Sequence, residues 1–97
     1  MKTIHLQFGK TVTRLADNQY GRQVYNEQVR NQIDFSTQTQ IVFPEQIVNI
    51  ASSFVQGFFH EIIKNVGILG IGTQILVVAP SINIEEKIMN NLLDVYD

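Results

Sequence analysis

The sequence feature that most constrains the fold is a regular apolar stripe between residues 53 and 66. Its large side chains repeat at four-residue intervals in two adjacent rows, formed by Phe54, Val55, Phe58, Phe59, Ile62, Ile63 and Val66. This spacing predicts a helix over about 53–66 with a wide buried face. Gly67 is suited to end that helix, because glycine readily takes the left-handed conformation found at helix C-termini.

Two strand-like runs flank this helix. Residues 38–43 form a short run that stops at Pro44, and residues 73–79 form a second, largely apolar run that stops at Pro80. A proline ring cannot continue a strand ladder, so both prolines mark strand ends. A strand, a helix and a strand in this order predict a βαβ crossover, with parallel pairing at the centre of the sheet.

The N-terminal third is expected to add a hairpin and a helix. Residues 3–8 alternate apolar and polar side chains, and after the Gly9-Lys10 turn residues 10–14 favour extended backbone again. A helix over about 18–32 follows, capped by Asp17 or Asn18. Gly21 weakens this helix, which indicates either a later start or a close neighbour.

The C-terminal segment predicts a third helix over about 83–94, with Ser81 or Asn83 as its cap. Strand and helix therefore alternate along the chain, which is typical of an α/β domain. At 97 residues the chain has the length of one domain, spanning 1–97. The expected architecture is a mixed four-stranded sheet (strands about 3–8, 10–14, 38–43 and 73–79) covered by three helices (about 18–32, 53–66 and 83–94).

Composition excludes several classes of function. Seven Lys and Arg against nine Asp and Glu give a net charge of −2 without a basic run, so no nucleic-acid partner is expected. The absence of cysteine excludes disulfides, thiol nucleophiles and Cys-type zinc sites. The longest nearly apolar stretch falls short of the ~20 residues that cross a bilayer, so no membrane partner is expected either. We therefore expect a cytoplasmic protein.

The chain also lacks the motifs of common catalytic sites. The glycines at positions 67, 70 and 72 follow a helix and precede a strand, the reverse of the order that a phosphate-binding loop requires. The segment from His60 to Lys64 begins like a zinc-peptidase helix, but Lys64 stands where the second histidine is needed. The carboxylates fall on polar helix faces. We therefore expect no catalytic residues, no metal, no cofactor and no enzymatic activity.

Ser52 and Ser53 stand where the middle strand passes into the predicted helix. The simple interpretation is helix capping, because a serine hydroxyl at an N-cap accepts a free backbone N–H and stabilises the helix by about 1 kcal/mol. The functional interpretation is a modification site, because a phosphate at a helix N-terminus is favoured by the helix dipole and changes what a partner can bind.

The segment from Ile41 to Ile63 resembles the STAS-like domains of unknown function found in bacteria and phages, which are distantly similar to anti-anti-sigma factors. In those domains too, a strand and a short loop lead into an amphipathic helix that opens with Ser-Ser-Phe, as Ser52, Ser53 and Phe54 do here. Gly21 to Val29 is similar to the helix that precedes this strand in the family, so the resemblance covers about residues 8–66. It implies a single-domain STAS-like sandwich.

The resemblance also implies a partner and a modification site. In the wider STAS group the junction carries Asp-Ser-Ser-Gly, and a kinase that doubles as anti-sigma factor phosphorylates the first serine. Ser52 falls on that position and Ser53 follows it, while Ala51 replaces the acidic residue and Phe54 the glycine. By resemblance, the expected partner is a histidine-kinase-like ATPase, and the candidate phosphorylation sites are Ser52 and Ser53.

Three hypotheses about function follow. The first is a non-catalytic cytoplasmic regulatory module that binds its protein partner through the junction, with contacts from Asn49, Ser52, Ser53, Gln56, Gly57 and His60. Gly57 would leave room for a partner backbone. The second is a structural or assembly protein that forms a homo-dimer or larger homo-oligomer and uses its serines only as caps. The third, an enzyme with a site between chains, would use His60, Glu61 and Lys64.

Overall fold

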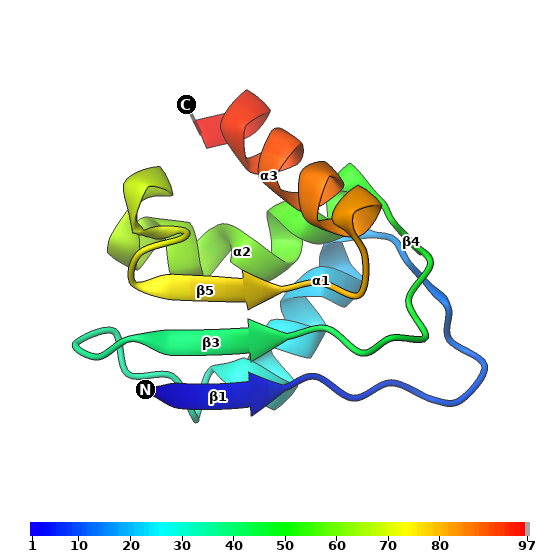
Figure 1. The fold of residues 1–97 in the computed structure, drawn as a ribbon, viewed down its shortest axis with the longest axis horizontal. Helices are drawn as coiled ribbons and strands as arrows, with labels where there is room; N and C mark the ends of the chain where they lie inside the picture. Colours follow the sequence, from blue (N-terminus) through cyan, green and yellow to red (C-terminus); the bar gives the residue numbers. More distant parts are fainter. Residues whose placement is uncertain (97) are drawn as a thin grey trace.

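The computed structural model describes residues 1–96, which fold around a small parallel sheet (Figure 1). The sheet contains β1 (Lys2–His5), β3 (Thr39–Val42) and β5 (Ile75–Val78), in the order β1-β3-β5. In the central register Ile4 lies beside Ile41, and Ile41 lies beside Val77. All three strands run in the same direction, so each connection between them must cross over through a helix.

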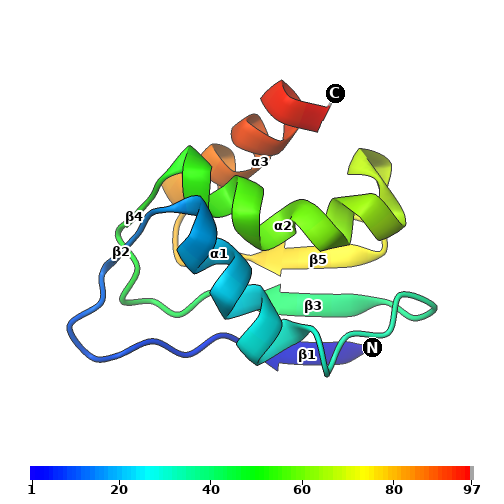
Figure 2. The ribbon, with the colours of Figure 1, turned by 180° about the vertical axis from the view of Figure 1, so that it is seen from behind.

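The two helical crossovers lie on one face of this sheet. The first crossover contains α1 (Asn18–Val24), which continues directly into a π-helical segment (Tyr25–Val29), and the second contains α2 (Ser52–Val66). After β5 the chain forms α3 (Ile82–Tyr96). Helix α2 contacts both α1 and α3 and lies between them, while α1 and α2 lie over the same face of the sheet (Figure 2). Within residues 1–96, no helix is long and apolar enough to cross a membrane.

A second, two-stranded ribbon joins the two loops at the carboxyl ends of the main strands. It pairs β2 (Arg14–Leu15) with β4 (Asn49–Ile50) in parallel. Backbone bonds extend it on both sides, since Val48 N–H donates to the Thr13 carbonyl and Ala51 N–H donates to the Leu15 carbonyl, both at 2.8 Å. The ribbon therefore holds the starts of α1 and α2 next to each other.

Helix α2 supplies the centre of the core. The side chains of Phe54, Phe58 and Ile62 are fully buried, as the apolar stripe predicted. The ring of Phe58 lies 5.7 Å from that of Phe43 on the strand side and 6.1 Å from that of Tyr25 on the helix side, measured between centroids. Burying such an aromatic side chain stabilises the fold by about 1.5–3 kcal/mol, so this cluster fixes α2 between the sheet and α1.

Two glycines allow α1 and α2 to cross in backbone contact. A Cβ atom at Gly21 would collide with the carbonyl oxygen of Phe54, and one at Gly57 would collide with the carbonyl oxygen of Asn18. The close neighbour that Gly21 indicated is therefore the first turn of α2. Any larger residue at either position would push the two helices apart.

The α/β class is confirmed, and the three expected helices all form. Asp17 caps α1 by accepting the Gln19 N–H at 3.2 Å, Ser81 caps α3 by accepting the Ile84 N–H at 3.2 Å, and Gly67 ends α2 with a φ of 70°. The predicted helix over 18–32 is shorter than expected, because its α-helical part stops at Val24 and the π-helical part stops at Val29.

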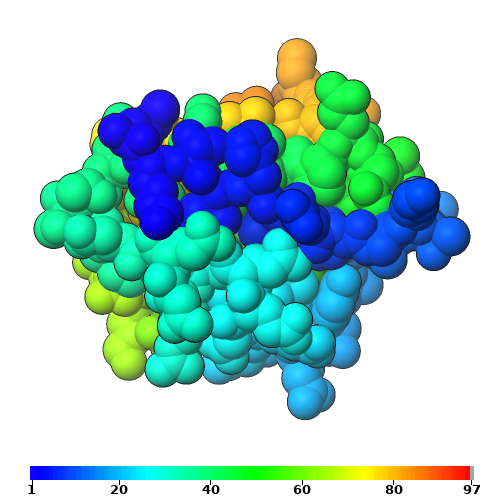
Figure 3. Space-filling view, turned by 90° about the horizontal axis from the view of Figure 1, so that it is seen from below, coloured from blue at the N-terminus to red at the C-terminus, as the bar shows by residue number. Residues whose placement is uncertain are grey.

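The mixed four-stranded sheet and the hairpin over 3–8 and 10–14 are wrong. The chain does not turn back at Gly9-Lys10, and β1 instead pairs in parallel with β3. The predicted second strand shrinks to β2, which belongs to the separate ribbon. One side of β1 is thus left as a sheet edge, which lies at the surface beside α1 (Figure 3). Pairing with a distant buried strand overrides the local turn, because it places Ile4 and Leu6 in the core.

Candidate functional site

At the strand-to-helix junction, the two serines have different roles. Helix α2 begins at Ser52, and its N-cap is the extended Ala51, which makes no side-chain cap bond. Ser52 is exposed, whereas the Oγ of half-buried Ser53 accepts the Asp17 N–H at 3.0 Å. Helix capping is therefore wrong for both serines. Ser53 ties the loop before α1 to the start of α2, and Ser52 presents its side chain to solvent.

The bond to Ser53 satisfies an unusual piece of backbone. Asp17 has a φ of 83°, a region that residues other than glycine rarely occupy. In this conformation its side chain caps α1, and its own N–H donates to the Oγ of Ser53. The start of α1 and the start of α2 are thus fixed to one another by a side chain as well as by the glycine contact.

Asn49 links the junction to α3. Its Oδ1 accepts the Ile50 N–H at 2.9 Å and also accepts from the Lys87 ammonium group on α3. Asn49 is half-buried, and its neighbour Val48 is 66% exposed. The junction therefore offers an exposed apolar side chain, an exposed serine and a lysine within one region at the carboxyl ends of the strands.

Three of the predicted partner-binding residues form a row along α2. Ser52, Gln56 and His60 are spaced by four residues, so they lie on one helix face, and none of them is buried. We call these three residues the polar row. Gly57 does not belong to it, because it is buried and the space beside it is filled by the backbone of Asn18. The idea that Gly57 admits a partner backbone is therefore wrong.

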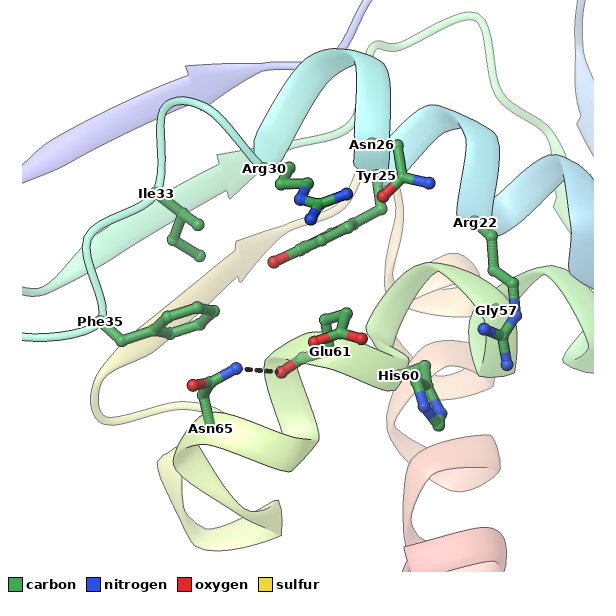
Figure 4. Close-up of a pocket in the computed structure, with 10 residues that line it drawn as sticks. All are labelled: Arg22, Tyr25, Asn26, Arg30, Ile33, Phe35, Gly57, His60, Glu61 and Asn65. Carbon is green, nitrogen blue, oxygen red and sulfur yellow. Dashed lines mark hydrogen bonds between the residues drawn. The ribbon is translucent and has the colours of Figure 1, made fainter.

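A groove of about 380 Å³ runs between α1 and α2 and reaches the polar row at His60 (Figure 4). Arg22, Asn26 and Arg30 line it from the first crossover, and Glu61 lines it from α2. Ile33 and Phe35, from the loop before β3, close one end with apolar side chains. Of the lining residues, the sequence had pointed to Gly57 and His60 as partner contacts and to Glu61 only in the enzyme hypothesis; the arginines were missed.

The π-helical segment shapes this groove. Arg30 N–H donates to the Tyr25 carbonyl, five residues earlier, at 2.9 Å. In an unbroken α-helix, at about 100° per residue, Arg22 and Arg30 would be separated by about 80° around the axis. The extra residue in the π turn reduces this to about 20°, so both arginines line the same cavity. Such π turns occur frequently at functional sites.

Tyr25 sits at the middle of the groove. Its ring packs edge-on against Phe58, and in Figure 4 its hydroxyl points toward Glu61 and the apolar end. Burial raises the pKa of the Tyr25 phenol above its ordinary value of 10.0, the negative charge of Glu61 raises it further, and the positive charge of Arg30 opposes both effects. The phenol is thus held neutral between a cation and an anion.

The other motifs singled out in the sequence have structural roles. Gly67 and Gly72 take φ values of 70° and 93° in the connection from α2 to β5, which also contains a short 3₁₀ turn (Ile68–Gly70). Within residues 1–96, no group of three or more His, Asp or Glu side chains is placed to hold a metal ion. The segment from His60 to Lys64 is an ordinary stretch of α2.

Comparisons of the sequence and of the structure matched no protein family, no curated protein and no solved structure.

Proposed function

We propose that this chain is a non-catalytic cytoplasmic regulatory module that binds a protein partner through the strand-to-helix junction, with Ser52 as its switch. The observation that carries the proposal is the contrast between the two serines. Ser53 is engaged in holding the fold together, whereas Ser52 is exposed on the first turn of the same helix. A modifying enzyme can therefore reach Ser52 without disturbing the bond on which the junction depends.

The surroundings of Ser52 fit a partner surface. The polar row continues from Ser52 through Gln56 to His60 along α2, and the exposed Val48 lies on the loop that leads into the same helix. Asn49 and Lys87 join α3 to this region. A partner that docks here would contact a rigid scaffold, because the glycine crossing and the Ser53 bond fix α2 relative to α1.

Phosphorylation of Ser52 would act through charge. A phosphate adds about −1.5 to −2 charges, and at the N-terminus of a 15-residue helix the free N–H groups and the helix dipole stabilise that charge. The same charge would weaken a docked surface that had been complementary to a neutral hydroxyl. The STAS-like resemblance supports a histidine-kinase-like ATPase as the partner and as the kinase.

The test is a titration of the purified protein with an ATPase domain of this class encoded beside it, using wild type, Ser52→Ala and Ser52→Asp. We expect wild type and Ser52→Ala to bind equally and Ser52→Asp to bind at least tenfold more weakly. Asn90→Asp, which adds the same charge at an exposed position of α3, is the matched control and should bind like wild type. Failure of the wild type to bind, or equal binding by Ser52→Asp, would contradict the proposal.

One observation favours the second candidate, an assembly protein. In Figure 1 no described helix lies over β1 and β3 on the face of the sheet opposite α1 and α2. Val42 and Leu76 are only half-buried there, and Val78 is exposed. A homo-oligomer could cover this face through a second copy of the sheet. Light scattering on the purified chain decides the matter: a monomer mass at micromolar concentration excludes this candidate.

A further inference from the structure

Charged side chains of opposite sign line the groove between α1 and α2. Arg30 and Glu61 line it from opposite helices, with the Tyr25 hydroxyl between them (Figure 4). Besides the effect of burial, Glu61 raises the pKa of Tyr25 and Arg30 lowers it, which agrees with their placement on opposite sides of the same cavity. A cation and an anion placed in this way present complementary charges to a ligand that carries one charge of each sign.

The closed end of the groove is apolar. Ile33 and Phe35 come from the loop before β3, and both are half-buried. Gln74 pins this loop by donating to the Phe35 carbonyl. The two apolar side chains are thus held in place beside the charged pair, and they offer contact to an apolar group of modest size.

The backbone brings these groups together at a cost. The π turn interrupts the regular α-helical hydrogen bonds in the middle of the first crossover. This places Arg30 on the groove wall that carries Arg22. A groove of about 380 Å³ lies at the lower end of the range found for small-molecule sites. This size suits a single small metabolite rather than a nucleotide cofactor.

We propose that the groove between α1 and α2 binds a free α-amino acid with an apolar side chain. The carboxylate of the ligand pairs with Arg30, its ammonium group pairs with Glu61, and its side chain packs against Ile33 and Phe35. Arg22 and His60 lie at the open end, where the groove meets the polar row. This site is independent of the proposed function, because neither Arg30 nor Glu61 belongs to the junction.

The charge pattern distinguishes this ligand from a simple anion. A ligand with only a carboxylate would pair with Arg30 but would meet the like charge of Glu61 in the same cavity. A ligand with only an ammonium group would pair with Glu61 but would meet the like charge of Arg30. Hydrogen bonds in which both partners are charged are the strong ones, so losing either partner should weaken binding by at least tenfold.

The experiment follows the amide resonances of the ¹⁵N-labelled full chain during titration with three probes. L-phenylalanine carries both charges, 3-phenylpropionate lacks the ammonium group, and 2-phenylethylamine lacks the carboxylate. We expect saturable shifts around Tyr25 and Glu61 with L-phenylalanine, and at least tenfold weaker binding of the other two probes.

Variants test the assigned contacts. Arg30→Gln and Glu61→Gln should each weaken L-phenylalanine binding at least tenfold, whereas Arg14→Gln and Glu45→Gln remove the same charges outside the groove and should leave it unchanged. The unliganded spectrum of each variant verifies its fold, and the three probes on wild type test the proposal without any variant. Three results would overturn the proposal. The first is equal binding of all three probes to wild type, and the second is no saturation by 50 mM L-phenylalanine. The third is that 3-phenylpropionate binds Glu61→Gln more tightly than L-phenylalanine binds wild type.

Discussion

At the residue scale, the hydroxyl of Ser53 helps to hold the two crossovers together. Ser53 accepts the N–H of Asp17, a residue with left-handed backbone, and both groups lie at the contact between α1 and α2. Ser52, next to it, makes no comparable contribution because its side chain is exposed. Adjacent serines of the same chemistry thus differ in what they do for stability.

We therefore predict that Ser53→Ala lowers the free energy of unfolding by about 0.5–1.5 kcal/mol, because it removes the hydrogen bond that the Asp17 N–H donates to the serine oxygen. Ser52→Ala should change the same quantity by no more than about 0.5 kcal/mol. Urea denaturation of both variants measures this. Equal destabilisation by the two substitutions would contradict the assignment of distinct roles.

Tyr25 gives a prediction about pH. Because its folded-state pKa lies above the ordinary value of 10.0, folding favours the neutral phenol. The stability that this contributes is complete below about pH 10 and is lost as the pH rises through the folded-state pKa. Wild type should therefore lose stability in this range more steeply than Tyr25→Phe, measured by thermal unfolding at a series of pH values.

The charges around Tyr25 offer an internal check on that prediction. Glu61→Gln should move the pKa of Tyr25 back toward its ordinary value, because one of the raising charges is removed. Arg30→Gln should move it further up, because the opposing charge is removed. Shifts of the same sign in both variants, seen in the ultraviolet titration of tyrosine, would show that these two residues do not face the phenol.

At the element scale, the crossing of α1 and α2 depends on two missing side chains. Replacing glycine by alanine inside a helix normally stabilises it by up to about 1 kcal/mol. At Gly57 the new methyl group would collide with the backbone of Asn18, which cannot move without breaking the cap at Asp17. The steric effect should exceed the gain in helix propensity.

We predict that Gly57→Ala lowers the free energy of unfolding by about 1–3 kcal/mol through overpacking. Gly9→Ala is the matched control, because its methyl group would meet Val12 at an ordinary contact distance of 3.7 Å. That control should stay within about 0.5 kcal/mol of wild type in the same denaturation assay. A stabilising Gly57→Ala substitution would mean that the helices cross less closely than described.

The elements also show what sequence reasoning could reach. The apolar stripe of α2 and the caps at Asp17 and Ser81 depend on neighbouring residues, and all three were predictable. The pairing of β1 with β3 was not, because Gly9-Lys10 has the local chemistry of a hairpin turn and the competing strand lies more than 30 residues away. Short-range signals cannot decide between a turn and a distant partner.

Of the two candidate sites, one was predictable from the sequence and the other was not. The junction was predictable, because it requires only that serines follow a strand and begin a helix. The groove was missed, because its arginines share a wall only after the π turn, and nothing in the sequence from Tyr25 to Val29 marks an i→i+5 bond. The one available signal was Gly21, which indicated a close approach of helices beside which a cavity could form.

At the scale of the whole molecule, the central strand sets the order of opening. β3 is paired on both sides, and amides at its two ends donate to residues 74–78: the Thr39 N–H to the Gln74 carbonyl at 3.0 Å and the Phe43 N–H to the Val78 carbonyl at 2.9 Å. The 3₁₀ turn after α2 carries Leu69, which is 87% exposed. Local stability should therefore differ greatly between these two regions.

We predict that the amides of Thr39 and Phe43 exchange with solvent only through global unfolding, so that their exchange free energies equal the value from denaturation. The amides of Gly70 and Ile71, in the connection to β5, should exchange at least a hundredfold faster. Native-state hydrogen exchange followed by NMR measures both. Comparable protection at the two places would show that the chain does not open in this order.

The π turn has one more consequence, for how the length of the first crossover can vary. Because the turn accommodates a single surplus residue, loss of one in-frame codon between Tyr25 and Val29 would restore regular α-helical winding. Arg30 would then stand seven positions after Arg22, about 700° further around the helix axis, and would keep its place on the same wall. A lineage of such chains can therefore gain or lose this residue in one genetic step and retain the pocket, while the surface around Ser52 is inherited unaltered.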